Sequence, residues 1–413
     1  MGPWPTRLRA AVAVAMLAAA PGCAPGVPGT PVKAPGGPPP GAVDVPLLAT
    51  GNLPTTPAPA LGNAGSPVEG ALIEARRMAA NVVGPWEVDP ELVSPTPLRA
   101  MVIKDAAGLA LIEPDAVAKA AGAHHIINGF ASDRQGLGQQ RLTNAVVRFA
   151  DPASAAAAAA DMAATALTTQ QPTAAPASAI PGHPDARAVT TGGGDQSPAT
   201  VFSYTPRGVY VLCQIAHTTD IDTATALIAK TLDLQGPLID RFAPTDPAKF
   251  ADLPADPTGL LARTMSASMW PYVKDSHSAT PTNPKVGVYQ PHGALHLQDD
   301  PPSVSAAFSA AGVQMMSYNF TSIYQAADPG AARRLASDLA NSLLQDEVSA
   351  QPFNGVDFMP TSTCVQYPLQ DSTTEFHYYC YAAADNFTIE THADDPVGAH
   401  WQLAAQYIML LAK

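Results

Sequence analysis

The sequence predicts an α+β protein made of two related halves that follow a disordered N-terminal tether. Three observations support this: a Pro- and Gly-rich stretch that cannot form a core, apolar runs of strand length between helical patterns, and an internal duplication. The predicted order in each half is β-α-β-α-β-β-α, and part of it resembles a ferredoxin-like unit, a sheet with helices on one face. The halves either join into one barrel-like body or form two lobes.

The first twenty-three residues have the order of a bacterial export signal. Two arginines precede an apolar run over 10–20, and Cys23 follows small residues at the expected cleavage point. We therefore predict a signal peptide over 1–23 and lipidation of Cys23, which would anchor the protein to the membrane. The preceding residues match a lipobox well only at Gly22, so ordinary cleavage near 18–20, which gives a secreted soluble protein, is the alternative. The apolar run is about half the length of a membrane-spanning helix.

Residues 24–65 have the composition of a spacer, because Pro and Gly make up nearly half of the chain from 21 to 60. Folded structure is then expected as an N-terminal half over 66–242, a linker with one short helix over 243–284, and a C-terminal half over 285–413. The formal net charge is −13 and Lys and Arg form no cluster. We therefore expect no nucleic acid as a partner.

The duplication rests on motifs that recur in the same order. Asp151-Pro152 in the first half and Asp328-Pro329 in the second each precede a helical pattern that carries another Asp ten residues after the first. Because Asp accepts hydrogen bonds from free backbone amides and Pro suits the first helical turn, we interpret both pairs as helix starts. The apolar runs over 108–112 and 293–297 also match, and we interpret each as the first strand of its half.

Local patterns predict the other elements. Ser66-Pro67 begins a helix that continues to Val83 and ends before Gly84-Pro85. A hairpin follows in each half, from strands over 201–204 and 209–216 in the first and over 376–382 and 387–391 in the second. Each hairpin leads into a further helix.

Three cysteines lie beyond the leader. Cys364 and Cys380 lie in neighbouring strand-like runs, and we predict a disulfide between them, which would stabilise the fold by about 3 kcal/mol in the chain-entropy model. Cys213 lies in an apolar strand and is interpreted as an inert core thiol. Three thiols do not fix their own pairing, so a bridge from Cys213 to either partner stays open.

The candidate pocket residues are His217 and Asp220 in the first half and His392 and Asp394 in the second. Each pair lies at a strand-to-helix corner, where a metal or acid–base site can form. The alternative is that Asp220 and Asp394 cap helices, which is the commoner role. We assign no catalytic residue, no cofactor and no metal ligand.

Other histidines and aromatic residues define no site by themselves. His277, His292 and His296 are too dispersed in the sequence. Alternate residues of a strand face the same side, so Tyr378 and Cys380 line one face and Tyr379 and Tyr381 the other. One set is expected in the core, and the other can border a pocket for a lipid or glycan.

Three segments resemble a known family: Thr50–Pro57, Glu74–Ala79 and Gly84–Asp89. They are similar to those of an actinobacterial, largely mycobacterial and nocardial, family of secreted lipoproteins built on a domain of unknown function. The resemblance implies an envelope location and an α+β body with distinct N- and C-terminal parts. It brings no known activity and no site residues.

The sequence contains none of four common enzyme signatures: a GxSxG elbow, a phosphate-binding loop, HExxH, or SxxK with its partner motifs. We therefore expect a non-enzymatic, lipid-anchored envelope protein that binds an envelope lipid, glycan or protein. The alternative is an envelope enzyme with a site between the two halves. A structural role in the envelope is a third possibility.

Overall fold

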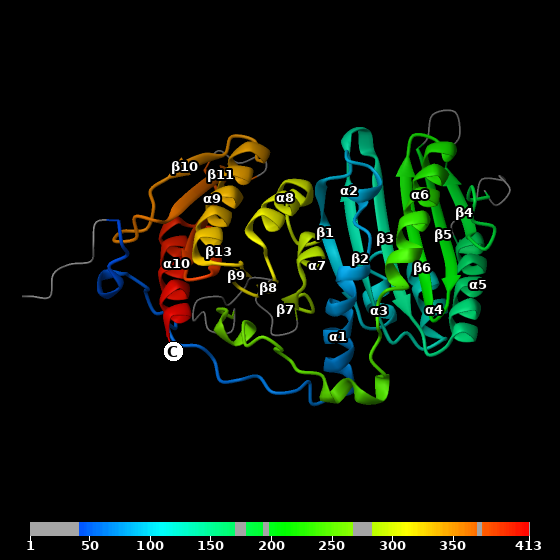
Figure 1. Cartoon of the computed structure of the whole chain (residues 1–413). Helices are drawn as coiled ribbons and strands as arrows, with labels where there is room; N and C mark the ends of the chain where they lie inside the picture. Colours follow the sequence, from blue (N-terminus) through cyan, green and yellow to red (C-terminus); the bar gives the residue numbers. More distant parts are fainter. Residues whose placement is uncertain (1–40, 170–178, 193–197, 267–282, 370–373, 413) are drawn as a thin grey trace, which may run out of the picture. The chain divides into compact units, whose positions relative to one another are not determined.

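Each half of the chain folds around an antiparallel sheet (Figure 1). The computed structural model describes residues 41–169, 179–192, 198–266, 283–369 and 374–412. The first sheet has six strands in the order β1-β2-β3-β6-β5-β4, and the second has seven in the order β10-β11-β12-β13-β9-β8-β7. The signal peptide, Cys23 and the first part of the predicted tether lie outside the described residues, as does His277.

The N-terminal half contains six α-helices and six strands among the described residues. Its helices are α1 (Pro67–Met78), α2 (Pro85–Val88), α3 (Ala106–Leu109), α4 (Asp115–Gly122), α5 (Pro152–Thr169) and α6 (Ile221–Ile239). Its strands are β1 (Ser94–Ile103), β2 (Asn128–Gln135), β3 (Arg141–Arg148), β4 (Arg187–Gly192), β5 (Ala199–Arg207) and β6 (Tyr210–Thr218).

The C-terminal half follows a similar plan. Its helices are α7 (Pro291–Leu295), α8 (Pro301–Ala311), α9 (Pro329–Asp346) and α10 (Pro396–Leu411). Its strands are β7 (Gly287–Tyr289), β8 (Met315–Tyr318), β9 (Ser322–Gln325), β10 (Gln351–Phe353), β11 (Thr363–Pro368), β12 (Phe376–Ala384) and β13 (Phe387–Ala393).

The two sheets share one topology, as an internal duplication predicts. Counted from β1 and from β7, the strands follow each other in the same order, and β10 is an additional edge strand. The predicted helix starts are also in place: Asp151 accepts a hydrogen bond from the Ser154 amide at the start of α5, and Asp328 accepts one from Ala331 at the start of α9. Ser66 caps α1 in the same way, through the amide of Glu69.

The predicted element order needs correction at the start of each half and in its number of strands, since it has four per half and the sheets have six and seven. The first strands are β1 and β7, whereas the runs over 108–112 and 293–297 belong to the short helices α3 and α7 and the turns after them. Apolar runs of this length do not distinguish a strand from a helix. Here the Asp105 side chain accepts a hydrogen bond from the Gly108 amide and so caps α3. Helix α1 is also shorter than predicted, because the chain continues after Met78 as a 3₁₀ helix over Ala79–Asn81.

Helices cover both faces of each sheet, rather than one face as a ferredoxin-like unit predicts. Helix α5 packs with Val147 and Val211 on one face of the first sheet, and α6 packs with Val146 and Leu212 on the other. Helices α9 and α10 divide the two faces of the second sheet in the same manner. Each sheet is therefore the middle layer of three, and its strands are apolar on both sides.

Residues 41–65 lie against the folded body, although their composition predicts a free tether. The amide of Asp44 donates to Phe358 O at 2.9 Å, and the amide of Ala58 donates to Ala262 O at 2.8 Å. The Leu53 side chain is buried. Pro and Gly disfavour helices, but they do not prevent an extended segment from bonding to its neighbours.

The connection between the halves contains two 3₁₀ helices, over Pro247–Asp252 and Leu261–Arg263, in the part that the structure describes. The first packs on α1. One apolar cluster includes Trp86 and Phe130 of the N-terminal half and Leu295 and Phe308 of the C-terminal half. The described residues from 41 onward belong to one compact unit, yet their two sheets do not join into one barrel.

None of the helices within the described ranges is both long and apolar enough to span a membrane.

Candidate functional site

A cavity of about 650 Å³ lies where β1 of the N-terminal half meets the sheet of the C-terminal half. The N-terminal half contributes residues 96, 97 and 99, and the C-terminal half contributes Lys285, Gln298, Asp299 and side chains of β8, β9, β12 and β13. This volume lies in the range of small-molecule binding sites. We refer to it below as the inter-half cavity.

An irregular stretch of β1 brings Arg99 to the cavity. The register of β1 against β2 shifts between Pro95 and Ala100, and Arg99 has a φ of 54°, which is unusual for a residue with a side chain. The Arg99 amide donates to Thr96 Oγ1 at 3.1 Å, which supports this turn. Its guanidinium pairs with Asp299 and donates to Leu297 O at 3.1 Å, so one side chain links the two halves.

Two further cations lie near Arg99. Lys285 lines the cavity and donates from Nζ to Leu98 O at 3.1 Å. Burial, together with the positive charges of Arg99 and Arg134, lowers the pKa of Lys285 to about 8. Arg134 is buried behind the wall and donates to His296 O at 3.0 Å and Gln298 O at 2.8 Å; burial, then repulsion from Arg99, lowers its pKa to about 9. Three positively charged side chains, those of Arg99, Lys285 and Arg134, therefore lie close together at or just behind the cavity wall.

Glu390 is a second acidic group of the cavity, besides Asp299. It lies on β13, and its carboxyl group accepts a hydrogen bond of 2.7 Å from the Tyr324 hydroxyl. Desolvation raises the pKa of Glu390 to about 7, and the hydrogen bond from Tyr324 opposes only part of this effect. The carboxyl group is therefore close to half protonated at neutral pH and can either donate or accept a hydrogen bond.

Aromatic side chains form much of the remaining wall. Tyr318, Tyr324 and Tyr379 line the cavity, and the ring of Tyr367 stacks on Tyr379 with centroids 5.8 Å apart. Tyr379 and Tyr381 share a face of β12, as alternation predicts, and Tyr381 is buried. Tyr379 borders the cavity while Tyr381 on the same face is in the core, so the two roles do not divide between the faces of the strand as predicted.

The two predicted histidine corners have different environments. His392 lines the inter-half cavity, and its Nε2 lies 3.2 Å from Nδ1 of His377 and 4.0 Å from Oδ1 of Asp394. In the first half, His217 Nδ1 lies 2.8 Å from Thr200 Oγ1, and Asp220 caps α6 by accepting from the amide of Thr223. The structure therefore brings His392 and Asp394 together, but His217 and Asp220 do not line this cavity.

The capping interpretation is correct for Asp220 and wrong for Asp394. Helix α10 begins at Pro396, and its capping side chain is that of Asp395, which accepts from the Gly398 amide at 2.7 Å. Asp394 is one residue too early to reach that amide. Its side chain instead extends toward His377 and His392 and remains 88% exposed.

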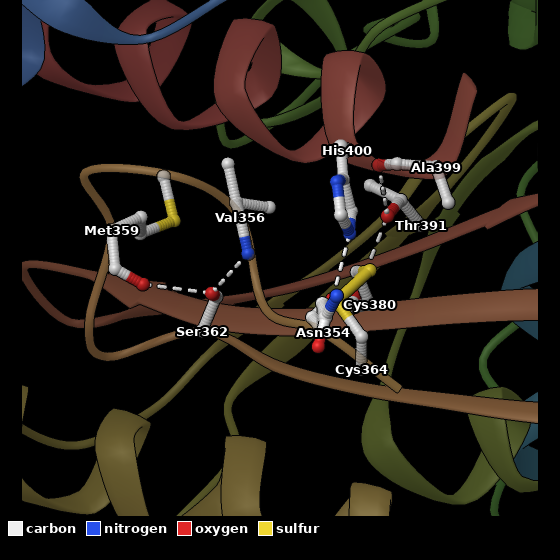
Figure 2. The surroundings of a disulfide bond; sticks show 9 residues. All are labelled: Asn354, Val356, Met359, Ser362, Cys364, Cys380, Thr391, Ala399 and His400. Carbon is white, nitrogen blue, oxygen red and sulfur yellow. Dashed lines mark hydrogen bonds between the residues drawn. A yellow bond between two sulfur atoms is a disulfide. The ribbon is translucent and has the colours of Figure 1, made fainter. Parts of the chain in front are cut away.

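The predicted disulfide joins Cys364 on β11 to Cys380 on β12, which are directly opposite in the strand pairing. Figure 2 shows it between the sheet and α10. The Thr391 hydroxyl donates to Cys380 O at 3.2 Å on the same side, and His400 of α10 bonds to Asn354 O at 2.8 Å. Cys213 is buried and unpaired, and burial raises the pKa of its thiol, so it fits an inert core residue.

His292 and His296 lie close together, as their spacing of four residues permits in a helical turn. His292 is on α7 and His296 directly follows its last residue, with ring centroids 5.6 Å apart. His296 is fully buried, with Nδ1 2.9 Å from Ser132 Oγ and Nε2 3.1 Å from Ala79 O. Burial lowers its pKa well below the usual value, so the ring is neutral and joins the halves.

Sequence reasoning missed the main charged groups of the cavity. Arg99, Lys285 and Asp299 are far apart in the chain and carry no motif. Glu390 had a usable signal, because it lies two residues before His392 on a predicted strand and therefore faces the same side.

Comparison with known proteins identifies the family. Profiles of a domain of unknown function, DUF7373, match the chain twice: the N-terminal domain over residues 61–255 and the C-terminal domain over residues 260–413. No curated protein and no solved structure matches the chain significantly. Together the two matches cover most of the chain, including every residue of the cavity wall named above, and the protein belongs to the DUF7373 family.

Proposed function

We propose that this protein is a ligand-binding module that takes a small anionic molecule, with a carboxylate or phosphate group, into the inter-half cavity. The excess of positive charge on one wall carries the proposal. Arg99, Lys285 and Arg134 lie close enough to repel one another. Asp299 forms an ion pair with Arg99, and Asp299, Asp133 and Asp300 each attract Arg134 less than Arg99 repels it. An anion beside Lys285 would relieve this repulsion, and charge-assisted hydrogen bonds are among the stronger polar contacts.

The other polar groups of the cavity support the same type of ligand. Tyrosine hydroxyls at Tyr318 and Tyr379 and the half-protonated carboxyl of Glu390 offer donors, while the rings offer apolar surface. A ligand with a polar head and a compact apolar or ring portion therefore fits better than a long hydrocarbon chain. The volume of about 650 Å³ sets its size at that of a small molecule.

We further propose that the protein acts in the cell envelope of an actinobacterium, held by a lipid on Cys23. The order of residues 1–23 supports export, and the cysteine at its end supports lipidation. Mass spectrometry of the N-terminal peptide from native membranes tests this. A diacylglyceryl mass on Cys23 supports the anchor, whereas an unmodified peptide that begins near residue 19 or 21 contradicts it.

The ligand proposal is tested with protein purified from its native envelope. Denaturation should release a bound carboxylate or phosphate compound, which mass spectrometry then identifies. Calorimetry with succinate and glucose 6-phosphate as probes should then show binding that Lys285→Met weakens at least tenfold. Lys104→Met is the matched control, since Lys104 is an exposed lysine just after β1. Equal affinities in wild type and Lys285→Met would contradict the proposal.

A second candidate function, an envelope enzyme, is favoured by one observation. The pKa of Glu390, about 7, suits a general acid or base near neutral pH, and the group lies in a cavity. In that case Glu390→Gln should abolish turnover of esters, phosphates or glycosides while ligand binding persists. If the wild type binds the ligand but does not turn it over, the enzyme function is contradicted and the ligand-binding function is retained.

A further inference from the structure

A cluster of metal-ligating side chains lies at the edge of the inter-half cavity. It consists of His377 on β12, His392 on β13 and Asp394, just beyond the end of β13. Nδ1 of His377 lies 3.2 Å from Nε2 of His392 and 3.7 Å from Oδ1 of Asp394. Strand pairing brings the three residues together. In the antiparallel pair of β12 and β13, His392 lies opposite Tyr379 and Ala393 lies opposite Tyr378. The next residue in each direction is Asp394 on one side and His377 on the other, so these two are also neighbours.

We infer that these three side chains bind a divalent transition metal ion of the zinc class. Zinc bonds to imidazole nitrogen at about 2.0–2.1 Å, so two nitrogens of a tetrahedral site lie about 3.3–3.4 Å apart. The separation of 3.2 Å between the two ring nitrogens is close to this value. Asp394 must approach by roughly half an ångström to complete a site of the same size, and its side chain, 88% exposed, is free to do so.

The surroundings hold both rings in place. The ring of Tyr379 packs on His392 with centroids 4.8 Å apart, and the ring of Tyr367 packs on His377 at 5.2 Å. A pre-positioned pair of ligands loses little conformational entropy on metal binding. Two imidazoles and one carboxylate favour zinc, nickel or copper over magnesium or calcium, which prefer oxygen ligands.

Two comparable clusters lack this arrangement. In the first half, Thr200 bonds to His217, and Asp220 is used as a helix cap. His400 lies near the sulfur atoms of Cys364 and Cys380, but these are joined in a disulfide and cannot act as thiolates. Among these three clusters, only the second-half corner places two imidazoles and a carboxylate within 4.8 Å of one another. Its two ring nitrogens hydrogen-bond to each other, and metal binding would replace that bond.

Three protein ligands leave a fourth position for water or a ligand atom. Because His392 also lines the inter-half cavity, the metal would lie at the rim of that cavity. The inference rests on the three side chains alone and does not require the anionic ligand proposed above.

The test uses the full chain, purified without a histidine tag and dialysed against a chelator. Titration with zinc sulfate, followed by calorimetry, should show a site that His377→Gln and His392→Gln each weaken at least tenfold, and Asp394→Asn several-fold. His183→Gln is the matched control. His183 lies 3.1 Å from one carboxylate, that of Asp233, as the cluster histidines lie near that of Asp394, but it is in no cluster of three ligating groups among the described residues. This variant should bind zinc as the wild type does.

A spectroscopic readout covers variants that fold poorly. Copper(II) bound to the wild type should give electron paramagnetic resonance hyperfine structure from two imidazole nitrogens. No zinc binding at 1 mM, or equal zinc affinity in the wild type and the His377→Gln/His392→Gln variant, overturns the metal site. Succinate binding by the metal-free wild type is measured in parallel, so failure of the metal site and failure of the anion proposal are distinguished.

Discussion

The hydroxyl group of Tyr204 donates a hydrogen bond of 2.9 Å to the carboxyl group of Glu113 in the core beneath α5. Glu113 is 4% exposed, and its other oxygen has no partner among the described residues. Burial raises the pKa of Glu113 to about 8, with the hydrogen bond from Tyr204 opposing part of the effect. The native protein therefore keeps this side chain as a neutral acid at pH 7.

This buried acid predicts stability that falls as pH rises. The unfolded chain releases the proton near pH 4.5 and the folded chain near pH 8, so the native state binds more protons between these values. The contribution of Glu113 to the free energy of unfolding is fully present below pH 4.5 and is lost by pH 8. Between these values the free energy of unfolding falls by at most about 1.4 kcal/mol per pH unit. Urea unfolding at pH 5.5, 7 and 8.5 measures the slope.

Glu113→Gln provides the comparison for that experiment. The amide cannot ionise, so the free energy of unfolding of this variant should depend less on pH over the same range. A slope equal to that of the wild type would show that other groups cause the dependence.

Anion binding should also weaken as pH rises. Glu390 loses its proton near pH 7 and Lys285 near pH 8, so both changes make the inter-half cavity more negative. Succinate is a suitable probe above pH 6.5, because its two carboxylates are then ionised. Its affinity, measured by calorimetry, should fall several-fold from pH 6.5 to pH 9. Glu390→Gln should remove the step near pH 7 and retain the one near pH 8.

The shared topology of the halves was predictable because its signals are local. An Asp-Pro pair favours a helix start through local chemistry, as at Asp151 and Asp328. It does not guarantee one, since Asp89-Pro90 and Asp256-Pro257 lie in turns.

A strand is expected to start near Ile126, but the predicted element order has no place for β2, because its side chains are mainly polar although they are buried. Asp133, for example, is bonded by Thr143 and Arg141 on the neighbouring strand, a contact that only the folded sheet provides.

The cavity was less predictable for the same reason. Arg99 reaches it through a register shift in β1, and Lys285 reaches it because the two halves pack together. His377 and Asp394 become neighbours only through the pairing of β12 with β13. A single sequence identifies residues that can carry chemistry, whereas their convergence depends on contacts between distant segments.

The disulfide should contribute measurably to stability. Cys364 and Cys380 are separated by 16 positions. In the chain-entropy model, closing a loop of this size lowers the entropy of the unfolded chain and so stabilises the folded state by about 3 kcal/mol. The Cys364→Ala/Cys380→Ala variant should unfold at correspondingly lower urea concentration. Reducing agent should lower the melting temperature of the wild type and leave that of the double variant unchanged. An equal effect of the reductant on both proteins would contradict this assignment.

Substitution of Gly70 separates helix propensity from packing. Gly70 lies inside α1, where propensity alone predicts that alanine would stabilise the helix by about 1 kcal/mol. A Cβ atom at this position would lie 2.1 Å from Phe250 O, on the 3₁₀ helix that packs on α1. Because that neighbour is backbone, it cannot move aside cheaply, and overpacking of this kind costs about 1–3 kcal/mol.

We therefore expect Gly70→Ala to lower the free energy of unfolding, against the propensity scale. Gly108→Ala in α3 is the matched control, since a Cβ there meets only ordinary contacts, the nearest at 3.5 Å. It should be neutral or slightly stabilising in the same urea experiment. A stabilised Gly70→Ala variant would mean that α1 and the segment after α6 separate readily, and that the N-terminal half is held by its sheet rather than by this contact.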